Sequence, residues 1–178
     1  MGDYQCGPER SEESMIVYDN HFNSNEWFIV VGLCTGIITM SLLPKRFPRK
    51  MTIVFFTCGV FSGFFFDHSL SVEPVSFYDV NDNSSYQFID FLSYISYGPL
   101  SYLFFYFYDR LKPGSIPLYI LIWSLISLGL EGLATYFGVF HYRFGYMLYY
   151  SFPIYLLVQS CWVVLYHRYR GGRKGWGK

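Results

Sequence analysis

The sequence has few charged residues, and this scarcity argues against an ordinary soluble protein. Asp, Glu, Lys and Arg make up 15% of the 178 residues, whereas a typical soluble domain carries about 25%. Hydrophobic residues make up 52% of the chain, as expected for a protein surrounded by lipid. No basic stripe alternates with polar segments, so we expect the lipid bilayer, and no nucleic acid, as a partner.

Cysteines are also few, and no two of them are spaced like the ligands of a metal site. Three lie inside apolar runs, and only Cys6 is expected outside the membrane. We therefore expect four unpaired thiols, no disulfide, no metal and no cofactor. The cysteines are Cys6, Cys34, Cys58 and Cys161.

Motifs of known catalytic sites are missing as well. The sequence contains no nucleophile elbow, HExxH helix, phosphate-binding loop or pair of intramembrane aspartates, so we expect no enzyme. The first 26 residues are polar and acidic, without a basic start and an apolar core. We therefore expect no cleavable signal peptide, and the first apolar run should stay as a membrane anchor.

Long apolar stretches dominate the rest of the chain. About 20 helical residues cross the hydrocarbon core, and a crossing segment must pair all its backbone polar groups. The stretches lack the alternating polarity of barrel strands, so the sequence predicts an all-α bundle of five transmembrane helices. The helices are expected at 27–43, 51–66, 87–108, 117–140 and 145–166, between an acidic tail at 1–26 and a basic tail at 167–178.

The basic residues predict the orientation. Eleven of the 13 Lys and Arg residues fall in the loop at 44–50, the loop at 109–116 and the tail at 167–178. Because Lys and Arg accumulate on the cytoplasmic side, these three segments are expected in the cytoplasm. The amino terminus and the acidic loop at 67–86 are then outside the plasma membrane.

Polar side chains recur at helical spacing in the last three helices, which places each set on one helix face. Lipid is a poor solvent for such a face, so we expect the three stripes to face one another. The stripes are Asp90, Tyr94, Tyr97, Ser101 and Tyr108; Ser124, Ser127, Glu131, Thr135 and Gly138; and Ser151, Tyr155, Gln159, Trp162 and Tyr166.

Glu131 is the most informative of these residues, because an ionised carboxylate inside a membrane must be paired or hydrated. Its depth predicts a hydrogen bond from Tyr94 or Tyr155. Together with Tyr97 and Gln159, these residues form a candidate intramembrane polar site. Glu131 is either a proton, cation or substrate site or a buried anchor that fixes helix packing, and the sequence leaves both interpretations open.

A second candidate cluster is expected at the outer boundary, where the second helix ends, the third begins and the sequence HYRFG joins the last two. The cluster comprises Asp67, His68, Asp90, His141 and Arg143. Two histidines with carboxylates suit a metal ion, but Arg143 would repel a cation. An ion pair of Arg143 with Asp90 or Asp67 is the preferred interpretation.

Glycines four residues apart mark close helix packing. Gly32 and Gly36 lie in the first helix, and Gly59 and Gly63 lie in the second. Because a short loop joins these helices, we expect them to pack on each other through the glycines. A homo-oligomer contact is the alternative.

Four segments of the sequence, LPKR, YFYDR, PLYILIWSLISLGLEG and GVFHYRFGYMLYYSFPIYLLVQ, resemble a group of small uncharacterised membrane proteins from spore-forming Gram-positive bacteria. The resemblance implies a five-helix fold in a bacterial plasma membrane. It implies no activity, so no role is transferred to Glu131, Tyr150 or Pro153, which lie in the matching segments.

Three functions remain. The first is a non-enzymatic membrane protein that acts through lipid, a membrane protein partner or a second copy of itself in the cell envelope. The second is a small carrier or channel with a polar pathway between the last three helices, in which Glu131 binds a proton or cation. The third, an intramembrane enzyme, is the least favoured because the catalytic motifs are missing.

Overall fold

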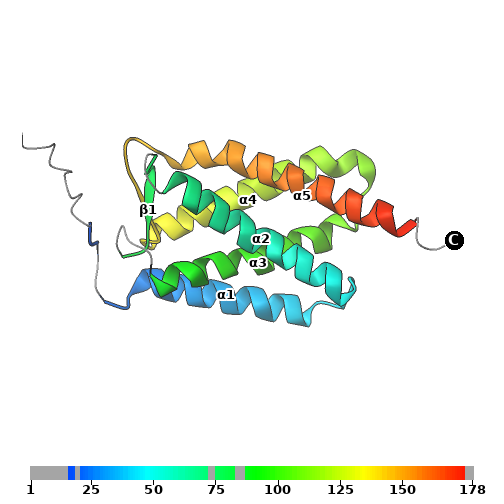
Figure 1. Cartoon of the computed structure of the whole chain (residues 1–178), viewed down its shortest axis with the longest axis horizontal. Coiled ribbons are helices and arrows are strands. Elements are labelled where there is room, and N and C mark those ends of the chain that lie inside the picture. The colour runs from blue at the N-terminus through cyan, green and yellow to red at the C-terminus, as the bar shows by residue number, and fades with distance from the viewer. Residues whose placement is uncertain (1–15, 19–20, 72–74, 83–86, 175–178) are drawn as a thin grey trace, which may run out of the picture.

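The chain folds into a bundle of five helices with a short two-stranded ribbon at one end (Figure 1). The computed structural model describes residues 16–18, 21–71, 75–82 and 87–174; Cys6 and most of the predicted acidic tail lie outside these ranges. The helices are α1 Ser24–Leu42, α2 Arg49–Leu70, α3 Phe88–Tyr108, α4 Ile116–Tyr136 and α5 Ser151–Lys174. The predicted all-α bundle is therefore confirmed.

Four segments of the described chain are long and apolar enough to cross a membrane, namely α1, α2, α4 and residues 148–170. The remaining helix, α3, is the innermost. Eleven of its 21 residues are buried, against three of the 21 in α4. Its tyrosine and serine hydroxyls make α3 less apolar, and a central position keeps those hydroxyls away from lipid.

Several helix ends differ from the sequence prediction. Helix α2 continues past Phe66 to Leu70, because Asp67 is held by a tyrosine from outside the helix. Helix α4 ends at Tyr136 rather than Phe140, and Gly138 then adopts a positive φ of 82° that reverses the chain. Helix α5 begins at Ser151 rather than 145, after a 3-10 turn at Leu148–Tyr150, and extends to Lys174.

The ribbon joins two loops that the sequence analysis treated as separate. Strand β1 (Tyr78–Val80) pairs antiparallel with β2 (Phe140–Tyr142), and Tyr78 lies opposite Tyr142. Alternate residues of a strand point to opposite faces, so these two tyrosines share one face of the ribbon. The HYRFG segment thus contributes to a strand as well as a turn.

An aromatic core closes the opposite end of the bundle. Phe104 and Phe105 of α3 are fully buried, where they contact Phe55 of α2 and Trp162 of α5. The basic connection between α1 and α2 and the carboxyl-terminal end of α5 lie at this same end (Figure 1). We call the buried residues here the aromatic cluster; they are Met51, Phe55, Tyr102, Phe104, Phe105, Tyr106, Tyr108, Val163 and Tyr166.

Gly36 of α1 and Gly59 and Gly63 of α2 pack against α3, whereas Gly32 meets no neighbour, so the expected hairpin packing of α1 on α2 is wrong. A Cβ added at Gly36 would lie 2.7 Å from the Pro99 side chain, and one added at Gly59 would lie 2.1 Å from the Tyr97 carbonyl oxygen. The spacing therefore marked close approach correctly but pointed to the wrong partner, since α3 lies between the two glycine-bearing helices.

Candidate functional site

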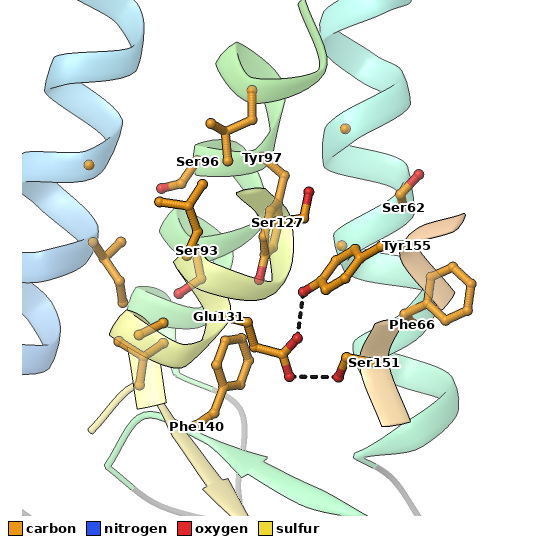
Figure 2. A pocket seen from close by; sticks show the side chains of 18 of the residues that line it. Ser62, Phe66, Ser93, Ser96, Tyr97, Ser127, Glu131, Phe140, Ser151 and Tyr155 are labelled. Atoms are coloured by element: carbon orange, nitrogen blue, oxygen red, sulfur yellow. Dashed lines mark hydrogen bonds between the residues drawn. The ribbon is translucent and has the colours of Figure 1, made fainter. Parts of the chain in front are cut away.

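A cavity of about 760 Å³ lies between the helices and beneath the ribbon. All five helices contribute to its wall, which is mainly aliphatic and aromatic, and a few polar groups point into it (Figure 2). The volume lies within the range of about 300–1,000 Å³ typical of small-molecule sites. The main polar residues of the wall are Ser62, Asp67, Ser93, Tyr97, Ser127, Glu131, Ser151, Tyr155 and Gln159.

Glu131 is held in this wall by hydroxyl groups. Ser151 donates a 2.7 Å hydrogen bond to its Oε1, and Tyr155 donates one of 2.7 Å to its Oε2 (Figure 2). Tyr142 donates a further bond of 2.8 Å to Oε1. The side chain is only 9% exposed. The predicted Tyr155 bond is therefore confirmed, whereas Tyr94 packs instead against Phe64 of α2, with ring centroids 5.7 Å apart.

Gln159 connects the polar stripes of α4 and α5. Ser124 donates a 2.9 Å hydrogen bond to the Gln159 side-chain oxygen, and the Gln159 amide donates a 3.1 Å bond to Ser127. These two stripes face each other as predicted. The α3 stripe is divided, because Tyr97 lines the cavity while Ser101 donates to the Phe55 carbonyl of α2.

Asp67 is a second carboxylate in the same cavity wall. Tyr78 donates a 2.7 Å hydrogen bond to its Oδ1, and its Oδ2 is buried with no hydrogen-bond partner among the described residues. Burial, followed by the charge and hydrogen bond of Asp67, raises the pKa of the Tyr78 hydroxyl well above its ordinary value. Tyr78 therefore keeps its proton and remains a donor to Asp67.

The ribbon links the two carboxylates. Tyr78 and Tyr142 lie opposite each other across β1 and β2, and each donates a hydrogen bond to one acid, Tyr78 to Asp67 and Tyr142 to Glu131. The two acids also interact electrostatically. The ribbon thus covers the cavity and orients both of its carboxylates.

The predicted outer-boundary cluster does not assemble. Arg143 pairs with Asp79 at 3.2 Å, rather than with Asp90 or Asp67. Asp90 accepts a 2.5 Å hydrogen bond from Asn81, and His68 is exposed, with its ring nitrogen 2.9 Å from the Phe64 carbonyl oxygen. Among the described residues, no three His, Cys, Asp or Glu side chains converge on a position for a metal ion.

His141 belongs to a contact on the other face of the ribbon. Its ring stacks on Tyr18 at 3.9 Å, and Tyr18 donates a 2.6 Å hydrogen bond to Asp79. Burial and this hydrogen bond raise the pKa of Tyr18 to about 12. These contacts hold Tyr18, which precedes α1, against the ribbon.

Sequence reasoning missed the roles of Tyr78, Asp79 and Tyr142. Each lies in a three-residue strand within a segment that looked like a polar loop or a turn. The alternation of apolar or aromatic with polar residues in YDV and FHYR was the available signal, because strands show a period of two. Runs this short are too ambiguous to identify a ribbon from sequence.

Comparison with known proteins adds no family to this picture. No family model, curated protein or solved structure matches the chain.

Proposed function

We propose that this chain is a small membrane carrier that binds a lipophilic molecule in the cavity, with Glu131 as a polar anchor. The observation that supports the proposal is a cavity of about 760 Å³ with apolar walls and a buried carboxylate in one wall. Binding sites for small molecules combine an apolar lining with a few positioned polar groups. A role limited to partner contacts would not need such a pocket between the helices.

A carrier is favoured over an open channel because the aromatic cluster fills one end of the bundle. Phe104 and Trp162 pack with ring centroids 5.3 Å apart, and the Tyr119 hydroxyl of α4 donates a 2.6 Å hydrogen bond to the Phe104 carbonyl. A molecule in the cavity could reach that end only after these groups separate. Transport through this protein therefore requires a conformational change.

We also propose that α3 crosses the bilayer with the other four helices, with the amino terminus outside and the carboxyl terminus in the cytoplasm of a bacterial plasma membrane. The basic segments that predict this orientation include Arg46 and Arg170, which both pair with Asp109 at the end of the bundle opposite the ribbon. A bacterial plasma membrane is the location that the sequence resemblance to proteins of spore-forming Gram-positive bacteria implies.

Tryptophan fluorescence gives a direct test, since Trp27, Trp123 and Trp162 all line the cavity. Protein in liposomes is titrated with three six-carbon probes, 1-hexanol, hexanoate and hexylammonium. We expect saturable binding of at least one probe, and its carrier-mediated uptake into the liposomes should fall in the Glu131→Gln variant, because the polar anchor is weakened.

Two glycine variants separate cavity binding from partition into lipid. A side chain added at Gly32, which lines the cavity, meets no atom within 4 Å, so Gly32→Leu should occupy part of the cavity and weaken binding. Gly129 has equally open surroundings but does not line the cavity, so Gly129→Leu should bind normally. Equal signals from wild type and Gly32→Leu for all three probes would contradict the proposal.

A further inference from the structure

The charged residues of the cavity wall, within the described part of the chain, are all acidic. Two carboxylates, Asp67 and Glu131, line the cavity, and no Lys, Arg or His is among the lining residues in the described part of the chain. Two acids that interact with each other at low dielectric, without a cation, are an unfavourable arrangement. A positively charged ligand would relieve it.

The two acids differ in the number of hydrogen bonds that their carboxylate oxygens accept. Glu131 accepts three hydrogen bonds, which occupy both of its oxygens. Asp67 accepts one from Tyr78 on Oδ1, while Oδ2 has no partner among the described residues although the side chain is only 4% exposed. A buried polar atom without a partner is costly, and such an atom needs an explanation. Asp67 Oδ2 is therefore the buried acceptor of this wall that has no partner among the described residues.

The rest of the wall suits an organic cation better than an inorganic one. Phe66, Trp123 and Trp162 present aromatic surface to the cavity, and aromatic faces attract ammonium groups while excluding water. A bare metal ion would need several further oxygen ligands, which the mainly apolar wall does not offer. The volume of about 760 Å³ also far exceeds what a single ion requires.

We propose that the cavity selects a protonated amine with a hydrophobic body, whose ammonium group pairs with the Asp67 carboxylate, in the same wall as Glu131. This proposal rests on the proposed carrier function and narrows its substrate class. Asp67 is the selectivity-determining residue, and the apolar wall between α1 and α5 holds the hydrocarbon part of the ligand.

Hexylammonium and 1-hexanol provide the test, because they share a chain length and differ in charge. In liposomes with wild-type protein, hexylammonium should bind at least about tenfold more tightly than hexanol, as expected for a charge-assisted hydrogen bond. In the Asp67→Asn variant this preference should disappear, while hexanol binding should be unchanged. The amide oxygen introduced by this substitution would still accept from Tyr78, so the variant should fold.

Asp109→Asn is the matched control, because Asp109 lies at the other end of the bundle and does not line the cavity. It should retain the full preference for hexylammonium. Equal affinities of the wild type for hexylammonium and hexanol would overturn the amine proposal and leave the carrier proposal standing. Failure of all three probes to bind the wild type would overturn both proposals. This comparison uses only the wild type, so it does not depend on the folding of any variant.

Discussion

Tyr155 and Glu131 lie 24 residues apart in the chain, and a hydrogen bond of 2.7 Å joins the tyrosine hydroxyl of α5 to the carboxylate of α4. The bond connects two helices across the wall of the cavity. It also supplies one of the three hydroxyl donors that keep a buried acid satisfied.

Replacing Tyr155 with Phe removes this donor and leaves a buried acceptor unpaired. We expect the free energy of unfolding in detergent to fall by about 1–3 kcal/mol. Tyr136→Phe is the matched control, because Tyr136 is 82% exposed at the end of α4, and it should unfold like the wild type. Equal stability of the two variants would show that the Tyr155 bond does not hold Glu131.

Gly59 should tolerate no side chain. An added Cβ would lie 2.1 Å from the Tyr97 carbonyl oxygen, which belongs to the α3 backbone and cannot rotate away. Gly59→Ala should therefore lower the unfolding free energy by about 1–3 kcal/mol. Gly32→Ala meets nothing within 4 Å and should be neutral or stabilising by up to about 1 kcal/mol. Similar effects of the two substitutions in a detergent unfolding assay would disprove the packing of α2 on α3.

Asp109 should make stability depend on pH. Burial raises its pKa, but hydrogen bonds from Tyr166 and Arg46 and the charges of Arg46 and Arg170 outweigh burial, so the pKa lies below its ordinary value. The ionised form therefore stabilises the fold above the ordinary pKa of about 4, and this contribution disappears as the pH falls through the lowered pKa.

The measurement for Asp109 is the difference in unfolding free energy between the wild type and Asp109→Asn. We expect a difference of about 1 kcal/mol near neutral pH, which shrinks towards zero as the pH falls below about 4. Comparing the two proteins at each pH removes the contributions of other acids. A difference that stays constant with pH would argue against an ionised Asp109.

Thiol labelling tests the proposed orientation. In a background without native cysteines, we expect Phe144→Cys to react with a membrane-impermeant maleimide added to intact cells, since Phe144 is 72% exposed beside the ribbon. Lys45→Cys, in the exposed basic loop after α1, should react only after the membrane is permeabilised. The opposite labelling pattern would invert the topology.

The sequence predicted the helices and part of the site because lipid imposes simple rules. Apolar length located the helices, and the helical period and depth of Glu131 identified Tyr155 as its partner. The sequence predicted that the polar stripe of α3 faces other helices, but not that α3 is the innermost helix, which the structure adds.

Other features depend on long-range contacts that leave little local signal. Asp67 looked like a boundary residue, because only the folded ribbon brings Tyr78 to it and extends α2 past it. The choice of Asp79 as the partner of Arg143 likewise depends on the pairing of β1 with β2. Glycine spacing reported close approach at Gly59 but contained no information about which helix approaches.

The ribbon also sets an order of events during synthesis. Val80 pairs with Phe140, 60 residues later, so β1 must wait until α3 and α4 have been made and inserted. Until β2 has been made, Glu131 lacks the hydroxyl of Tyr142, and Tyr78 lacks the strand that pairs with it beside Asp67. In the nascent bundle, therefore, Glu131 lacks part of its hydrogen bonds, and no paired strand holds Tyr78 beside Asp67. Pairing of β1 with β2 over the cavity is a late step of folding.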